Sequence, residues 1–187
     1  MLDPLYNPND PTGPRKSRFW ALRHSARDKP QPWRWPLDAL AGRSPMVLAQ
    51  GITNRHGVEI GYESRPYDAQ LFVPVFAAQD GEVMHCGETV SGFAISIDHK
   101  REGFATYYSH LSKVFVEQNP TRFNPRRQWV RGGDVIGYAA KSPIHLRFAL
   151  WQWDAAGGFV AVDPIAKFSE WIAPLAKPEP AAIAEAA

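Results

Sequence analysis

The chain has 187 residues, of which 44% are hydrophobic and 21% charged, which is enough for one domain with its own core plus extensions. Its formal net charge of +2 is only mildly basic and does not by itself indicate nucleic-acid binding. The single cysteine, Cys86, excludes an internal disulfide framework and a cysteine-rich zinc site, and we expect it to be a small buried hydrophobe.

Residues 1–32 are predicted to form a basic, proline-rich N-terminal arm without a core of its own. Aromatic side chains in and just after it can anchor it to a neighbouring domain: Phe19, Trp20, Trp33 and Trp35. The start of the chain lacks the basic and apolar regions of a secretory signal, and no apolar run is long enough to span a bilayer. We therefore expect a protein that is cytoplasmic, carried in a particle, or delivered by a non-standard route.

Residues 33–171 are predicted to form a β-rich domain. Helical periodicity occurs only in Pro164–Trp171, whereas short segments rich in β-branched and aromatic residues recur between glycine-containing turns. These predicted strands are 57–62, 71–77, 82–86, 93–98, 104–110, 134–138 and 144–153. Residues 172–187 are rich in alanine and proline and are predicted to be a flexible tail.

The segment Ile144-His145-Leu146-Arg147-Phe148 alternates apolar and polar residues, so His145 and Arg147 should project from one face of a strand. It has the form of a metal-binding His-x-His strand in which the second histidine is replaced by arginine. A guanidinium stays protonated and offers no lone pair, so Arg147 cannot bind zinc.

Several other chemistries are excluded by the motifs that they need. The chain contains no phosphate-binding glycine loop, no dinucleotide fingerprint and no Gly-x-Ser-x-Gly nucleophile elbow. Cys86 and His85 cannot form a nucleophile pair, because neighbours on a strand point to opposite faces.

Eight short motifs follow one another along roughly residues 33–165. In chain order they are Trp35-Pro36-Leu37, Gly57-Val58-Glu59-Ile60, Val73-Pro74-Val75-Phe76-Ala77 with Asp80-Gly81-Glu82-Val83, Ile97-Asp98-His99, Thr106-Tyr107-Tyr108-Ser109-His110-Leu111, Val130-Arg131-Gly132-Gly133-Asp134-Val135-Ile136-Gly137, His145-Leu146-Arg147-Phe148 and Val162-Asp163-Pro164. This ordered set resembles the LytM/lysostaphin-type zinc endopeptidases, which cut peptidoglycan cross-bridges. The resemblance implies a mainly β fold, a two-layer antiparallel β-sheet sandwich of the duplicated hybrid motif type, with a groove that holds zinc.

The resemblance also assigns roles to particular positions. In the family, a His-x-x-x-Asp segment and the last histidine of His-x-His bind the zinc, and the corresponding positions here are Arg55, Glu59 and Arg147. Two further family histidines assist the bound water, and these are retained as His110 and His145. Zinc needs ligands that are unprotonated at neutral pH, so we expect no bound metal and no catalysis by the two histidines.

A charge comparison suggests what replaces the metal. A family site with zinc and one aspartate sums to +1, as do the two arginines and one glutamate at the former ligand positions. We hypothesise that Arg147 takes the structural place of the metal through a bidentate bond to Glu59. Two alternatives remain open: a pair of unrelated surface arginines, or a zinc site made by His56, Glu59 and one of His110 or His145.

The segment before His145 is shorter than the family's usual loop, so one lip of the groove is predicted to be missing. An added stretch, residues 117–129, contains Arg122, Phe123 and Trp129 and suits either a protein contact or a plain surface loop. The sequence therefore predicts an inactive LytM-like binding or structural module for a partner protein or a peptidoglycan fragment, in a setting such as a phage particle or secretion device. The alternative is a zinc endopeptidase with a non-standard ligand set.

Overall fold

The computed structural model describes residues 32–40, 42–51, 57–65, 71–100, 102–117, 128–141, 144–154, 157–173 and 175. Predictions that concern the arm before residue 32, the tail beyond residue 175, Phe19, Trp20, Arg55, His56, Arg122 and Phe123 lie outside the described residues.

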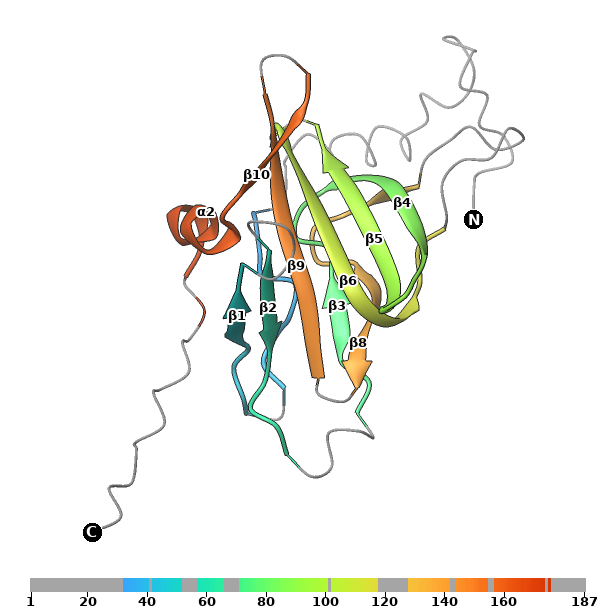
Figure 1. Ribbon diagram of the computed structural model, residues 1–187, viewed down its shortest axis with the longest axis vertical. Helices are drawn as coiled ribbons and strands as arrows, with labels where there is room; N and C mark the ends of the chain where they lie inside the picture. Colours follow the sequence, from blue (N-terminus) through green and yellow to red (C-terminus); the bar gives the residue numbers. More distant parts are fainter. Residues whose placement is uncertain are drawn as a thin grey trace, which may run out of the picture. The chain divides into compact units, whose positions relative to one another are not determined.

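Within the described part of the chain, ten strands form one antiparallel sheet (Figure 1). The strands are β1 (Met46–Gln50), β2 (Val58–Gly61), β3 (Pro74–Phe76), β4 (Gly81–Thr89), β5 (Gly92–His99), β6 (Phe104–Val114), β7 (Trp129–Val130), β8 (Val135–Lys141), β9 (Ile144–Trp153) and β10 (Phe159–Val162). Their order is β1-β2-β9-β8-β6-β5-β4-β7, while β10 pairs with β9 and β3 with β8. The predicted mainly β, antiparallel fold class is confirmed.

All seven predicted strand segments and the helix α2 (Pro164–Trp171) are present. The sequence reasoning missed β1, β7 and β10. Each of these strands pairs with a single neighbour. Strand β3 also pairs with a single neighbour and was predicted, so an edge position weakens the local signal without removing it.

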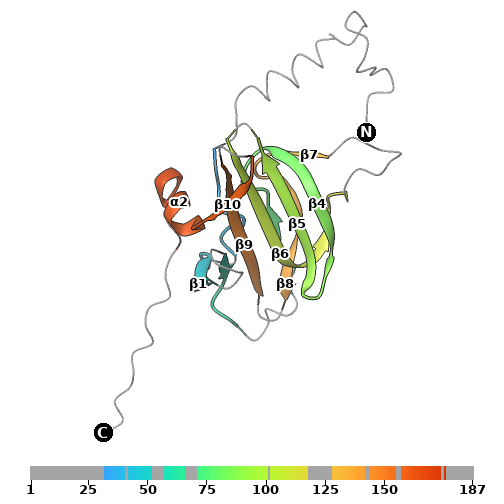
Figure 2. The same ribbon diagram turned by 45° about the horizontal axis from the view of Figure 1, so that its top comes forward.

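Strand β6 joins two parts of the sheet (Figure 2). Its first part, Phe104 to Ser109, pairs with β9, and its last part, from Leu111 onward, pairs with β8. The change of partner falls at His110, whose φ of 61° lies in the left-handed region. That conformation costs a non-glycine residue about 1 kcal/mol or more, so the surrounding pairing must hold it in place.

The core lies on the inner face of the sheet. Fully buried side chains include Ile60, Ile95, Ile97, Tyr108, Ile136, Leu146, Phe148 and Leu150. On β9 the buried residues alternate with partly exposed ones, so His145 and Arg147 share the outer face, as the alternation predicted. Cys86 is buried and the adjacent His85 is exposed, which agrees with the predicted separation of these side chains onto opposite faces.

Helix α2 closes one end of the core. Asp163 caps its first turn, because its Oδ1 accepts a hydrogen bond from the backbone N–H of Ile165 at 2.9 Å. Phe168 of the helix packs on Trp35, with 4.5 Å between ring centroids, and Trp171 stacks on Trp33 at 4.6 Å. These two tryptophans therefore anchor the segment that follows the arm, as expected. None of the described residues belongs to a helix long and apolar enough to cross a membrane.

Candidate functional site

The pairing register of β2 with β9 brings Glu59 and Arg147 together. The two residues are direct cross-strand partners, so their side chains lie next to each other on the same face. Arg147 Nε donates a hydrogen bond to Glu59 Oε1 at 2.8 Å, with the side chains 30% and 18% exposed respectively. The hypothesis that Arg147 takes the structural place of the metal requires this contact. The hydrogen bond runs through Nε alone, however, and is not the bidentate bond that we expected.

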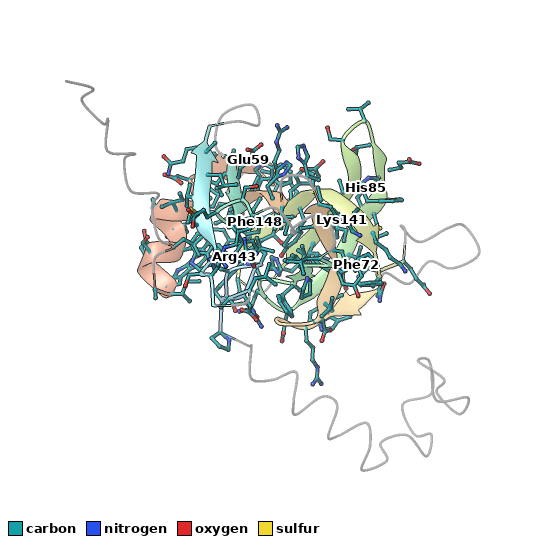
Figure 3. The ribbon with its side chains drawn as sticks, turned by 90° about the horizontal axis from the view of Figure 1, so that it is seen from below. Arg43, Glu59, Phe72, His85, Lys141 and Phe148 are labelled. Carbon is teal, nitrogen blue, oxygen red and sulfur yellow. The ribbon has the colours of Figure 1, made fainter. Side chains whose placement is uncertain are left out.

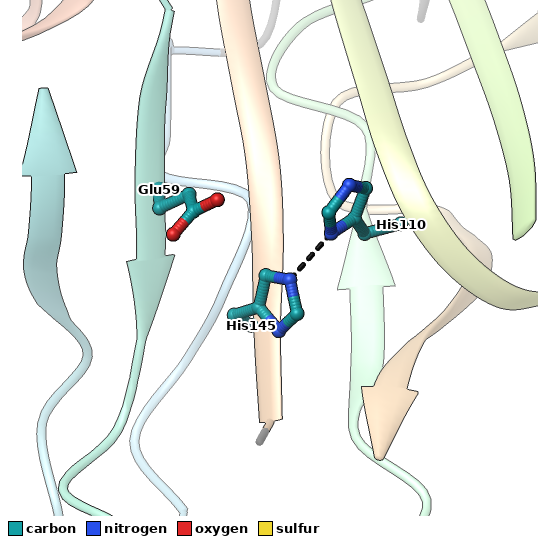
Figure 4. A group of neighbouring side chains, drawn as sticks. All are labelled: Glu59, His110 and His145. Atoms are coloured by element: carbon teal, nitrogen blue, oxygen red, sulfur yellow. Dashed lines mark hydrogen bonds between the residues drawn. The ribbon is translucent and has the colours of Figure 1, made fainter. Parts of the chain in front are cut away.

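The two retained histidines meet next to this ion pair. His110 comes from the bend in β6 and His145 from the start of β9, and His110 Nδ1 is hydrogen-bonded to His145 Nε2 (Figure 4). The ring centroids lie 4.6 Å apart with the rings nearly perpendicular, at 79°. In such a contact one imidazole donates and the other accepts, so at least one of the two rings is uncharged. We call Glu59, His110, His145 and Arg147 the β2–β6–β9 site.

His110 is biased toward its uncharged form. Burial lowers the pKa of His110 below its usual value of 6.5, and the positive charges of Arg147 and His145 lower it further, against a smaller opposing effect of Glu59. The Nε2 atom of this imidazole is buried and has no hydrogen-bond partner in the described structure. An uncharged His110 thus has one ring nitrogen bonded to His145 and one left over.

The donor set could hold a metal ion only after rearrangement. Glu59, His110 and His145 each offer one ligand atom, and these atoms lie within 4.8 Å of one another. Two imidazoles and a carboxylate are a set that zinc accepts. However, Glu59 is bonded to Arg147, and His110 to His145.

The charge of Arg147 adds to this obstacle. Two unit charges about 4 Å apart repel by about 4 kcal/mol at an effective dielectric of 20, and the repulsion doubles for a divalent ion. As arranged, these side chains fit an ion pair and a histidine pair better than a metal.

Among the other predicted site residues, Trp129 lies in the described part of the chain but away from this site. Trp129 was predicted in an added loop but forms β7, where it pairs with Glu82 of β4. Arg55 and His56 lie outside the described residues, so the structure places neither the first former ligand position nor the alternative ligand.

His99 lies outside the β2–β6–β9 site and is fully buried. Its Nδ1 lies 2.8 Å from the carbonyl oxygen of Asp80, and its Nε2 lies 2.7 Å from Thr106 Oγ1. Burial lowers the pKa of His99 to about 4, so this imidazole is uncharged at neutral pH. Its role is to complete a buried hydrogen-bond network.

Sequence reasoning missed Gly61, the direct partner of His145 across β2 and β9. A Cβ atom at this position would lie 2.4 Å from the carbonyl oxygen of Ile144, so only glycine allows the two strands to approach here. A glycine inside a strand pattern is the signal that could have indicated this close approach.

Comparison with known proteins gives one family. The sequence model of peptidase family M23 matches residues 57–164. This range contains all four residues of the β2–β6–β9 site. No curated protein sequence matches the chain.

Solved structures of similar fold include a putative glycyl-glycine endopeptidase LytM from Ruminococcus gnavus, which is 19% identical, with a TM-score of 0.54 over 79% of this chain and 63% of that one. The antimicrobial peptidase lysostaphin from Staphylococcus simulans is 21% identical, with a TM-score of 0.45 over 62% of this chain and 44% of that one. A SpoIIIAH–SpoIIQ complex matches with 19% identity and a TM-score of 0.48, over 72% of this chain and 99% of that one. The chain thus spans less than half of the lysostaphin chain.

Proposed function

The chain belongs to peptidase family M23, and from this premise we propose that its β2–β6–β9 site binds a peptide ligand instead of cutting it. The observation that carries the proposal is the bond from Arg147 to Glu59. In zinc peptidases the bound ion polarises the scissile carbonyl and activates a water molecule. Arginine supplies a positive charge beside the carboxylate, but it has no lone pair or open coordination position with which to activate water.

The remaining donors of Arg147 indicate what kind of ligand fits. Its Nε is engaged by Glu59, whereas its terminal amino groups have no hydrogen-bond partner among the described residues. The side chain is 30% exposed, so these N–H groups are accessible. Carbonyl and carboxylate oxygens of a peptide are the acceptors that a guanidinium recognises best. A segment of a partner protein and a peptidoglycan peptide both carry such groups.

The first experiment tests whether the cation has displaced a metal. Protein purified without chelator is analysed for zinc by mass spectrometry, and its melting temperature is followed as zinc is added. We expect no stoichiometric zinc in the unmodified protein. Arg147→His should gain zinc binding, because it removes the repelling charge and adds a fourth donor beside Glu59, His110 and His145. At a free zinc concentration of 100 times its Kd, the ion would stabilise that variant by about 2.7 kcal/mol.

The chain offers a matched control. Lys100 pairs with Glu82 at 3.0 Å, so Lys100→His also places a histidine beside a glutamate, but away from the β2–β6–β9 site. This variant should gain no zinc binding. Stoichiometric zinc in the unmodified protein, held as tightly as in Arg147→His, would refute the displacement of the metal.

The second experiment tests binding without cleavage. A synthetic cross-bridge peptide is titrated calorimetrically into the unmodified protein and into Arg147→Gln, and the mixtures are then analysed for products. We expect binding that weakens about tenfold in Arg147→Gln, since one charged hydrogen-bond donor is worth about 1.5 kcal/mol or more. No cleavage products should appear. Cleavage by the unmodified protein contradicts the proposal.

A second candidate function, zinc endopeptidase activity, is favoured by a specific observation. The ligand atoms of Glu59, His110 and His145 lie within 4.8 Å of one another, and Nε2 of His110 has no partner in the described structure. If zinc separated the two histidines and displaced Arg147, these three residues would hold it. That activity requires stoichiometric zinc in the unmodified protein and loss of both zinc and cleavage in His145→Ala.

A further inference from the structure

A second surface feature gathers side chains of β6, β8, the residues just before β3 and the residue just after β6, and we call it the β8 patch: Phe72, Lys113, Phe115, Tyr138 and Lys141. Phe72 and Phe115 both contact Tyr138, with ring centroids 5.4 and 4.8 Å away. Phe72 is 61% exposed and Phe115 is 42% exposed. Contiguous exposed rings of this kind mark interaction surfaces, because burying them in a partner removes apolar area from water.

Both lysines of the patch lie over its rings. Lys141 Nζ is 3.4 Å from the ring centroid of Phe72, and Lys113 Nζ is 5.5 Å from that of Phe115. Phe72 and Lys141 can be seen side by side in Figure 3. Neither ammonium has a carboxylate partner among the described residues. The three stretches that carry the patch, 71–76, 111–116 and 135–141, contain two lysines and no acidic residue. The patch therefore presents two positive charges, and these three stretches contain no carboxylate that would neutralise them.

The register of the strands places the patch beside the β2–β6–β9 site. Lys113 and Pro74 are both cross-strand partners of Tyr138, so the three side chains share one face. Ala140 lies two residues along β8 from Tyr138 and is the cross-strand partner of His145. The face that carries the patch thus continues into the face that carries His145.

We propose that the β8 patch docks an acidic segment of a partner protein, one that also carries aromatic or aliphatic side chains. Tyr138 lies between the two lysines, since it contacts both Phe72, which carries Lys141, and Phe115, which carries Lys113. An extended peptide can place a carboxylate at each ammonium and an apolar side chain on the rings between them. This inference goes beyond the proposed function and holds whether or not the site binds a metal.

The test uses the full chain and two synthetic peptides, one alternating glutamate with phenylalanine and one alternating glutamine with phenylalanine. Affinities are measured by calorimetry, and amide NMR shifts locate the binding surface. We expect the acidic peptide to bind more tightly than the neutral one and to lose affinity with added salt. The double variant Lys113→Gln/Lys141→Gln should weaken that binding by about 2- to 30-fold, a range that follows from two exposed ion pairs. Phe72→Ala should weaken it as well.

Matched controls separate this result from a general effect of charge. Lys167 is partly exposed, pairs with Glu170 and lies over the ring of Trp171 at 5.5 Å, whereas Lys100 is exposed and pairs with Glu82. The double variant Lys100→Gln/Lys167→Gln therefore removes two cations elsewhere. This control and Phe159→Ala should leave binding unchanged. Equal binding of the neutral peptide, or unchanged binding in Lys113→Gln/Lys141→Gln, overturns the proposal. A third outcome also overturns it: tighter binding to vesicles with about 30% anionic lipid than to the acidic peptide, lost in Lys113→Gln/Lys141→Gln. That result would assign the patch to a membrane surface.

Discussion

Replacing Arg147 with leucine should destabilise the fold by removing the partner of a mostly buried carboxylate. Arg147 Nε lies 2.8 Å from Glu59 Oε1. The side chain of Glu59 is 18% exposed and that of Arg147 is 30% exposed. Breaking a fully buried pair costs about 3–5 kcal/mol, whereas a surface pair contributes about 0–1 kcal/mol. These exposures lie between the two cases, so we expect a loss of about 1–2 kcal/mol, or about 2–8 °C in melting temperature.

The measurement is a double-mutant cycle at pH 7, with urea unfolding followed by tryptophan fluorescence. The cycle compares Arg147→Leu, Glu59→Gln and the double variant. Because the double variant no longer buries an unpaired carboxylate, it should lose less stability than the two single changes added together. We expect a coupling energy of about 1 kcal/mol.

The pair of Lys100 and Glu82 supplies the control cycle, with side chains 59% and 32% exposed. Its coupling should be about 0.5 kcal/mol or less, because both groups are better solvated. If the coupling of Glu59 with Arg147 is no larger than this control, Arg147 does not act as a structural substitute for a metal.

Three further predictions concern the framework of the site. The folded protein resists protonation of His99, whose pKa is about 4 when folded and about 6.5 when unfolded, so stability should fall by about 3 kcal/mol as pH drops from 6.5 to 4. Urea unfolding across that range should show less pH dependence in His99→Gln than in the unmodified protein. Gly61→Ala should cost about 2 kcal/mol in the same assay, because its Cβ would meet the carbonyl oxygen of Ile144 at 2.4 Å. At His110, with its φ of 61°, a β-branched valine should cost about 1–2 kcal/mol more than glycine. Equal stability of His110→Val and His110→Gly would show that this backbone conformation is not kept.

The strands of this protein could be predicted from local pattern where they lie in the middle of the sheet. The alternation of Ile144 to Phe148 is a local property with a period of two, and it correctly assigned His145 and Arg147 to one face. Every strand with two or more neighbours was predicted, whereas β1, β7 and β10, which each pair with a single neighbour, were missed; of the strands with one neighbour only β3 was predicted. The order of short motifs predicted the family, which the match over residues 57–164 confirms.

The composition of the site was decided by tertiary structure. Glu59 and Arg147 are 88 positions apart, and they meet because β2 and β9 pair in one register; a shift of one residue would move either side chain to the other face. His110 reaches His145 only because β6 changes partner at a residue with positive φ, which no sequence period indicates. The β8 patch likewise needs β6, β8 and the segment before β3 brought together. The sequence alone determined which side chains share a face of each strand, since that depends on neighbouring residues. Which faces meet depends on long-range register, which only the folded sheet fixes.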